Sequence, residues 1–181
     1  KKTGKRNQFI KRINDFQLII DWIQSQEKYQ NYEIHTVGFS IGATTVINGG
    51  FHNTSIGKII AISAMANYRE CVKNVGFLVH LSYALKGVNL SPTDDVNEDL
   101  SPYLRIQKEY GNISEKKWEY LSSKILMIHC QNDRIIDITN FQKNSEILSL
   151  KEQNKVLFAK GGHSMKKNEC ALVAACLRFL D

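Results

Sequence analysis

The sequence has 181 residues, the length of a single domain that can bury a sizeable hydrophobic core. Hydrophobic residues make up 43% of it, but no apolar run approaches the ~18 residues that a membrane span requires, and no apolar signal region opens the chain. These features exclude stable membrane insertion and indicate a globular, cytoplasmic protein. The cysteines form neither a C-x-x-C pair nor a dense disulfide pattern, which indicates reduced thiols; they are Cys71, Cys130, Cys170 and Cys176.

The formal net charge of +6 is confined to the N-terminal segment. Six basic side chains occur there without an acidic one, and the rest of the chain carries equal numbers of basic and acidic residues. They are Lys1, Lys2, Lys5, Arg6, Lys11 and Arg12. A basic tail can touch phosphates, but the aromatic and base-reading residues of a nucleic-acid binder do not accompany it. We interpret the segment as solvated and expect no nucleic-acid partner.

The first half of the chain alternates helical and strand patterns. Apolar residues at helical spacing predict an amphipathic helix over residues 9–26. EIHTVGF (33–39) predicts a short buried strand, and residues 42–48 predict a helix that Gly49 and Gly50 end. GKIIAIS (57–63) is continuously apolar, as strands of parallel sheets are.

Residues 64–121 differ in character and predict a small lid inserted between strands of the sheet. Helical patterns at 68–86 and 114–121 flank the segment 91–103, SPTDDVNEDLSPY, which we expect to be a surface loop. This segment contains both prolines of the chain, Pro92 and Pro102, together with four acidic residues.

The strand and helix alternation then returns to the end of the chain. Strands are predicted over 124–130 and 154–160, and helices over 138–150 and 168–180. The prediction is an α/β fold with a mostly parallel sheet and flanking helices, in one domain over residues 1–181 with the lid at 64–121.

A Gly-x-Ser-x-Gly pattern stands where the first predicted strand passes into a helix. It comprises Gly38, Ser40 and Gly42. Such a turn can raise a serine hydroxyl above the sheet and direct the next backbone N–H, that of Ile41, toward an oxyanion. We expect a side chain at either glycine to collide with the neighbouring strand or helix. By itself the pattern is weak, and a serine that merely caps the helix is the alternative.

A serine nucleophile needs a histidine to accept its proton and a carboxylate to orient that histidine. Asp133 and His163 each lie a few residues beyond a predicted strand end, at the same edge of the sheet as Ser40. Taken singly, Asp133 could be a loop acid or helix cap, and His163 a solvated loop residue. Together, the order Ser40, Asp133, His163 favours a catalytic set over these alternatives.

Other residues fit the catalytic roles less well. Asp137 lies nearer a helix start, where an anion favours the helix dipole. His35 and His129 belong to strands and are interpreted as structural, whereas His52 and His80 have no carboxylate at a useful sequence spacing. Neither a metal-ligand cluster nor a glycine-rich phosphate loop occurs, so no metal or cofactor is expected.

The elbow Gly38–Gly42, the acid loop HCQNDRIID and the histidine loop GGHSM resemble those of the α/β-hydrolase superfamily. The resemblance covers the chain from the helix before the elbow onward, and it points to the branch of serine esterases, monoacylglycerol-lipase-like lysophospholipases and serine peptidases. The segment DLSPYLRI is also similar to dipeptidyl-peptidase-like and dienelactone-hydrolase-like members. Two positions depart from the acid-loop pattern: Cys130 replaces a glycine and Asp137 a proline.

The same resemblance implies that about four strands normally precede the elbow, and the chain begins after them without a methionine. Its four strands would then form one half of the sheet, with the elbow strand as an exposed apolar edge. We expect this edge to be covered by upstream sequence, another polypeptide or self-association. A second oxyanion donor, normally supplied by the loop after the third strand, would also come from outside these residues.

The implied function is a serine hydrolase that cleaves a carboxylic ester, with thioesters and amides as further candidates. Ser40 would attack, His163 would shuttle the proton and Asp133 would orient His163. Small or medium acyl groups are favoured because the lid is short and contributes apolar residues, among them Phe77, Leu78, Tyr83 and Leu85. The alternative from another class is a non-catalytic hydrolase-like fragment or interaction module that needs a partner to complete its fold.

Overall fold

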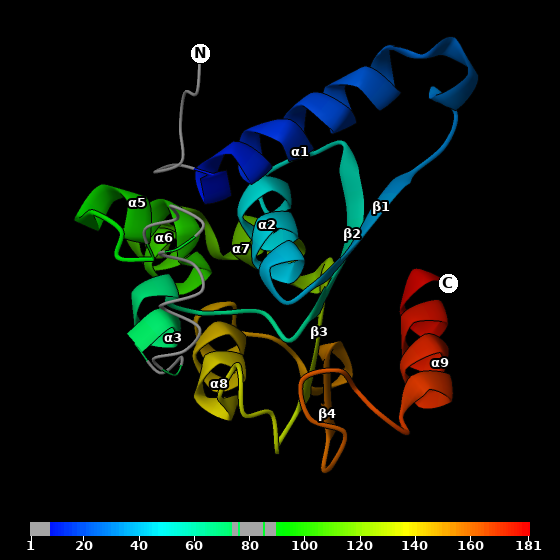
Figure 1. Cartoon of the computed structure of the whole chain (residues 1–181). Helices are drawn as coiled ribbons and strands as arrows, with labels where there is room; N and C mark the ends of the chain where they lie inside the picture. Colours follow the sequence, from blue (N-terminus) through cyan, green and yellow to red (C-terminus); the bar gives the residue numbers. More distant parts are fainter. Residues whose placement is uncertain (1–7, 74–75, 77–84, 86–89) are drawn as a thin grey trace.

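A computed structural model describes residues 8–73, 76, 85 and 90–181. Four parallel strands form its sheet, in the order in which they occur along the chain (Figure 1). The strands are β1 (Ile34–Phe39), β2 (Ile56–Ile62), β3 (Ile125–Cys130) and β4 (Lys155–Phe158). Because the strands are parallel, their carboxyl ends meet at one edge, where loops can bring distant residues together.

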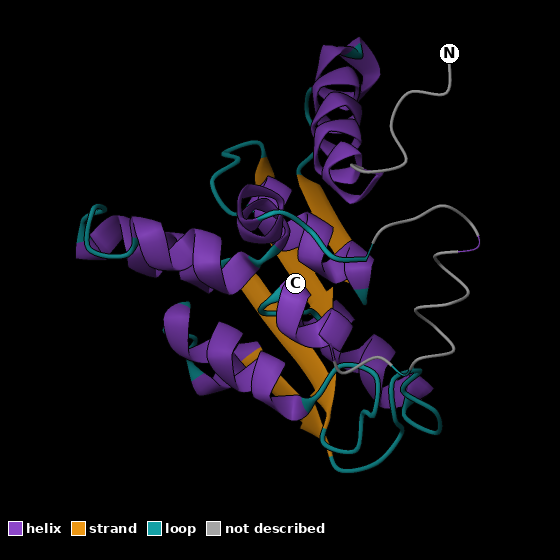
Figure 2. Ribbon diagram, turned by 60° about the vertical axis from the view of Figure 1, so that its left-hand side comes forward, coloured by secondary structure: helices purple, strands orange, loops and turns teal. Residues whose placement is uncertain are grey.

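Helices pack on both sides of this sheet (Figure 2). They are α1 (Gln8–Ser25), α2 (Ile41–Gly50), α3 (Tyr68–Lys73), α5 (Asp94–Leu100), α6 (Pro102–Glu109), α7 (Glu115–Ser123), α8 (Ile138–Ile147) and α9 (Glu169–Leu180), with short 3-10 turns η1 (Glu27–Tyr29) and η2 (Glu152–Asn154). Within the described residues, no helix is both long and apolar enough to cross a bilayer.

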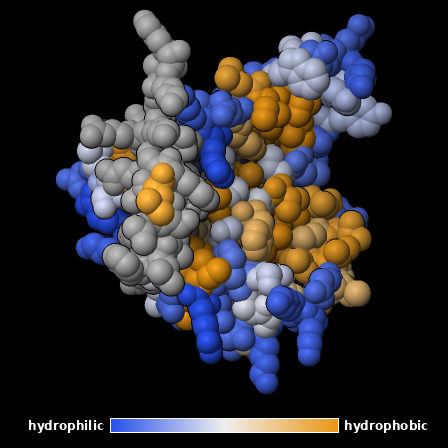
Figure 3. All heavy atoms as spheres, viewed as in Figure 1, coloured by the Kyte–Doolittle hydropathy of each residue, from blue (hydrophilic) through white to orange (hydrophobic). Residues whose placement is uncertain are grey.

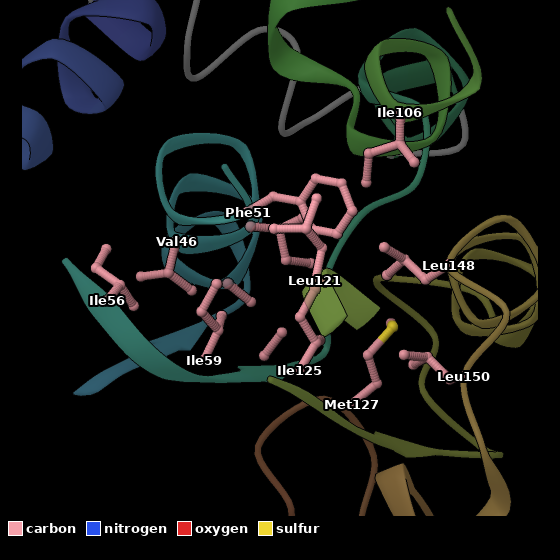
Figure 4. Close-up of a cluster of buried hydrophobic side chains, with 14 of the residues drawn as sticks. Val46, Phe51, Ile56, Ile59, Ile106, Leu121, Ile125, Met127, Leu148 and Leu150 are labelled. Carbon is pink, nitrogen blue, oxygen red and sulfur yellow. The ribbon is translucent and has the colours of Figure 1, made fainter. Parts of the chain in front are cut away.

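Two hydrophobic clusters show how the sheet is covered. Alternate strand residues such as Ile59 and Met127 pack with side chains of α2, α6, α7 and α8, and Figure 4 shows this cluster around Phe51 and Leu121. Their neighbours in sequence, such as Ile60, face the other side, where α9 covers them. Side chains of a strand alternate between faces, so a continuously apolar strand requires cover on both, as the sequence of β2 and β3 predicts.

The structure corrects the expectation of a loop over 91–103. This segment forms α5 and the start of α6 instead. Asp94 and Asp95 occupy the first turn of α5, where carboxylates favour the helix dipole. Pro102 opens α6, where proline is tolerated because the first-turn N–H groups have no intrahelical partner. Turn-forming residues in this segment therefore mark helix starts.

Other boundaries differ in smaller ways. Gly49 and Gly50 are the last two residues of α2, so the helix includes the glycines that were expected to follow it. A Cβ at Gly49 would lie 2.5 Å from a ring carbon of Phe16, so this glycine permits close packing of α1. The helix predicted over 68–86 is described as α3 to Lys73, and most of its remainder lies outside the described residues.

The strand that carries Gly38 is an edge of the described sheet, as the sequence predicts. Val37 and Phe39 of β1 are 56% and 44% exposed. On α1, Leu18, Ile19 and Trp22 are also largely exposed. Figure 3 shows hydrophobic side chains gathered over α1 and beside α9. An open edge with apolar flanks is a surface that favours pairing with further chain.

Candidate active site

Ser40 occupies a strained turn between β1 and α2. Its φ of 55° lies in the left-handed region that few non-glycine residues adopt. The turn is held by its own backbone: Ser40 N–H donates to Ile62 C=O at 2.8 Å, and Thr44 N–H donates to Ser40 C=O at 3.2 Å. This geometry fixes the hydroxyl at the carboxyl end of the sheet.

The two elbow glycines are not equivalent. A Cβ at Gly38 would overlap the Gly42 carbonyl and lie 2.6 Å from the Ala43 backbone nitrogen, so only glycine fits. A Cβ at Gly42 would meet no heavy atom of the described chain within 4 Å. The expectation of a collision at either glycine is therefore correct for Gly38 and wrong for Gly42, because β1 approaches the backbone of α2 on one side only.

His163 reaches the site from the loop after β4, which turns sharply at Gly161 and Gly162, with φ of 135° and 60°. Gly162 N–H donates to Asn132 Oδ1 at 2.8 Å, which ties this loop to the one after β3. The Phe39 ring lies 5.0 Å from the imidazole, measured between ring centroids. These contacts orient His163, whose side chain is 17% exposed.

The structure brings together the three side chains that the sequence singled out. His163 Nε2 lies 3.0 Å from Ser40 Oγ, and His163 Nδ1 lies 2.8 Å from Asp133 Oδ2. The residues come from the loops after β1, β3 and β4, at one edge of the sheet. A hydroxyl, an imidazole and a carboxylate in this order form a path along which the serine proton can move to the imidazole.

Asp133 is buried, and its carboxylate is surrounded by donors. Oδ1 accepts from Ile135 N–H at 2.8 Å and from Ile136 N–H at 3.0 Å. Burial alone would raise the pKa of Asp133, but the hydrogen bond from His163 and the two backbone donors outweigh it and lower the pKa below its usual value. The group is thus ionised at neutral pH.

The two departures in the acid loop leave Asp133 in place. Cys130 is buried beneath the histidine loop, with Sγ 3.2 Å from Met165 Sδ. Asp137 caps α8 by accepting from Thr139 N–H at 2.9 Å, and this bond lowers the pKa of Asp137. Asp137 is therefore engaged with the helix, as its position near the helix start predicts.

His129 has a positioning contact that the sequence does not reveal. It is fully buried, and burial lowers its pKa, so the imidazole is neutral. In that state Nε2 donates to Ile136 C=O at 2.9 Å, next to the backbone that holds Asp133. A histidine four residues before an acid is the only sequence signal of this arrangement.

His35 and His52 stand outside the site. His35 Nδ1 accepts from Lys58 N–H at 3.1 Å, a structural contact. His52 has no carboxylate at a useful sequence spacing, as expected, but the fold pairs it with Glu109, which lies 57 residues away in sequence. His80 lies outside the described residues.

Ile41 begins α2, and its backbone N–H is one of the first-turn amide groups that have no acceptor within the helix. Its side chain packs against a cluster in which Met65, Tyr68 and Leu100 of the segment 64–121 are buried. This segment is held by polar contacts as well: Tyr68 N–H donates to Ser101 Oγ at 2.9 Å. Of the apolar lid residues singled out earlier, Leu85 is 80% exposed, and the others lie outside the described part of the chain.

Burial makes three of the four cysteines unsuitable as nucleophiles. All four are free. Burial raises the pKa of Cys71 to about 12 and also raises the pKa of Cys130 and Cys176, so these thiols are protonated at neutral pH. Across the described residues, no group of three or more His, Cys, Asp and Glu side chains is arranged to hold a metal ion.

Comparisons with known proteins agree with this architecture. The model of a family described as BAAT / Acyl-CoA thioester hydrolase C terminal matches residues 12–168. The comparison with curated proteins gave no match.

Solved structures with this fold include several hydrolases. The esterase domain of a Rhodothermus marinus protein is 13% identical, with a TM-score of 0.56, over 93% of this chain and 66% of that one. A 2,6-dihydroxy-pseudo-oxynicotine hydrolase is 14% identical, with a TM-score of 0.62, over 92% and 45%. Pyrococcus horikoshii acylaminoacyl peptidase is 12% identical, with a TM-score of 0.57, over 92% and 25%. The fold is thus that of the C-terminal part of an α/β-hydrolase, and the chain spans only part of each of these proteins.

Proposed function

The chain belongs to the family BAAT / Acyl-CoA thioester hydrolase C terminal, and from this premise we propose that it is a serine hydrolase that cleaves a carboxylic ester through an acyl-enzyme on Ser40. Thioesters and amides are the related acyl compounds to be tested beside esters. The observation that carries the proposal is the continuous hydrogen-bonded path from Ser40 Oγ through the imidazole of His163 to Asp133.

In the first half of the proposed reaction, His163 Nε2 accepts the proton of Ser40 as Oγ attacks the acyl carbon. The tetrahedral intermediate then collapses: the bond to the leaving oxygen or sulfur breaks, and the Nε2 proton passes to the leaving group. In the second half, water gives a proton to Nε2 as its oxygen attacks the acyl carbon. The bond between that carbon and Ser40 Oγ then breaks, and the Nε2 proton passes to Oγ, which releases the acid and restores Ser40. Asp133 stays ionised throughout because its pKa is low.

The oxyanion of the intermediate requires N–H donors near the acyl carbon. Ile41 N–H at the start of α2 is the donor that we assign. The second donor is proposed to come from a segment that covers the open edge of β1. That segment is upstream sequence, another polypeptide or a second copy of the chain, and the apolar side chains beside β1 would pack against it.

Labelling with a fluorophosphonate probe tests the proposal, because such probes react with an activated serine. The complete protein should be labelled at neutral pH, and Ser40→Ala should abolish labelling. Ser123→Ala is the matched control, since Ser123 lies at the end of α7 and its hydroxyl is bonded to Tyr120 C=O. Absence of labelling in the folded, complete protein would refute the hydrolase and favour the non-catalytic interaction module.

A further inference from the structure

Cys130, one of the two departures from the acid-loop pattern, contacts both loops that supply the proton path. It is the last residue of β3 and is fully buried. Its C=O accepts from Asp133 N–H at 3.1 Å and so closes the turn that carries the carboxylate. Its thiol contacts the other loop, the one after β4 that carries His163. A single residue thus links the positions of Asp133 and His163.

The thiol meets the loop after β4 on both sides of His163. Before His163, Sγ lies 3.5 Å from Lys160 C=O, within reach of its S–H as a weak donor. After His163, Sγ lies 3.2 Å from Met165 Sδ. Met165 is buried and belongs with Cys130 to the hydrophobic cluster that α9 covers. The backbone that carries His163 is therefore supported by one sulfur atom at two points.

No free space separates this sulfur from the loop. A Cβ at Gly161 would lie only 3.0 Å from Cys130 Sγ. Gly161 has a φ of 135°, which glycine adopts without strain and other residues rarely adopt. Because protein interiors are close-packed, loss of a buried group leaves a void that neighbouring chain fills only by moving. Truncation of Cys130 should therefore let the loop after β4 shift.

The loop itself is strained and depends on its surroundings. Met165 and Lys167 have φ of 57° and 66°, in the left-handed region that costs non-glycine residues energy. Met165 N–H donates to Gly162 C=O at 3.2 Å, which closes the turn around His163. Strained conformations of this kind persist only where the surrounding structure fixes them. The buried contact between Met165 and Cys130 is one of the contacts that do so.

We propose that Cys130 is a positioning residue for His163: its thiol fixes the loop after β4 and thereby the distance from His163 Nε2 to Ser40 Oγ. The inference rests on the proposed function. Because Cys130 is fully buried, it touches no substrate and acts only through the backbone of the loop. A displacement of about 1 Å between reacting groups can cost about 10²-fold in rate, so the effect belongs in kcat.

Steady-state hydrolysis of an ester by the complete protein tests the proposal, with kcat expressed per active site titrated by fluorophosphonate. Cys130→Ala should lower kcat at least about tenfold and leave KM within about twofold. Cys130→Ser keeps an atom at the γ position and a donor toward Lys160 C=O, so it should restore kcat to within about threefold of the parent. A merely structural cysteine would change the free energy of unfolding and the number of titrated sites, but not kcat per site.

Cys176→Ala is the matched control. Cys176 belongs to α9 and packs, half-buried, against the same hydrophobic cluster as Cys130, so the same atoms are removed outside the loop that carries His163. Its kcat per site should stay within about twofold of the parent. Parental kcat in Cys130→Ala, or an equal loss in Cys176→Ala, would overturn the inference and leave the proposed function standing.

Met165→Leu replaces Cys130→Ala if circular dichroism shows that the latter does not fold. Substitutions that conserve apolar volume are usually tolerated, but leucine has no atom in the place of Met165 Sδ against the thiol. This variant should lower kcat per site by about threefold or more with KM unchanged. Parental kcat in folded Met165→Leu would overturn the inference.

If the parent protein neither cleaves esters nor reacts with the fluorophosphonate, the proposed function fails, and the positioning role is judged by proton NMR. The proton between His163 Nδ1 and Asp133 Oδ2 should give a separate downfield signal in the parent. Cys130→Ala should shift or abolish this signal, and Cys176→Ala should not. An identical signal in Cys130→Ala and the parent would overturn the positioning role as well.

Discussion

His163 Nε2 lies 3.0 Å from Ser40 Oγ, although 123 residues separate the two in sequence. The contact forms because β1 and β4 are parallel strands of one sheet, so their following loops meet at the same edge. The other ring nitrogen of the imidazole, Nδ1, lies 2.8 Å from Asp133 Oδ2. Substitutions of Ser40, His163 and Asp133 should therefore differ in how much catalytic activity and how much folding stability each of them removes.

Replacement of His163 by Asn should reduce kcat by about 10³-fold or more while the fold is kept, because no other group lies in reach of the Ser40 proton among the described residues. Ester hydrolysis by the complete protein measures the loss, and circular dichroism checks the fold. Activity within about tenfold of the parent would mean that His163 is not the base.

Asp133→Asn should lower both activity and stability at neutral pH. The folded-state pKa of Asp133 lies below its usual value of 3.8, so its ionised form stabilises the fold above that pH, and this contribution is lost as pH falls through the folded-state pKa. We expect a loss of about 1–3 kcal/mol at pH 7, because the variant amide leaves a buried donor without an acceptor.

Urea unfolding of the parent and Asp133→Asn, measured from pH 7 down to pH 3, tests this sign. The difference in free energy of unfolding should be constant near neutrality and narrow below about pH 4. Asp15→Asn is the control, because Asp15 is an exposed residue of α1. A difference that widens toward low pH would contradict the assignment.

Gly38→Ala and Gly42→Ala form a matched pair at the two elbow glycines. The Cβ at position 38 would overlap the backbone of α2, so this variant should be strongly destabilised, by about 3 kcal/mol or more. The Cβ at position 42 meets no described atom, and alanine favours helix by about 1 kcal/mol over glycine, so this variant should keep its thermal midpoint or raise it. Equal destabilisation by both would show that further chain packs on Gly42.

The open edge of β1 predicts that these residues on their own do not form a stable monomer. Exposed Val37 and Phe39 should drive self-association at micromolar concentration, and Val37→Lys should reduce it by placing a charge on the edge. Sedimentation velocity measures both. A monodisperse, well-folded monomer of the 181 residues would contradict the prediction that a further segment covers this edge.

From the sequence alone, the class of fold is predicted correctly, and the three candidate site residues are singled out. Continuously apolar strands and apolar residues at helical spacing are local patterns that can be read along the chain. The order of Ser40, Asp133 and His163 can be read there as well. The strands that carry the elbow and the acid loop agree with their predicted ranges to within a residue or two, because burial on both faces demands an unbroken apolar run.

Which groups contact one another is visible only in the folded protein. His52 contacts Glu109, 57 residues away, and Ser40 contacts His163, 123 residues away. The His129 bond to Ile136 C=O and the different space at Gly38 and Gly42 join nearer residues, but they depend on the three-dimensional course of the loop and the helix. Packing brings such residues together through the sheet, and no spacing along the chain encodes the distance between them.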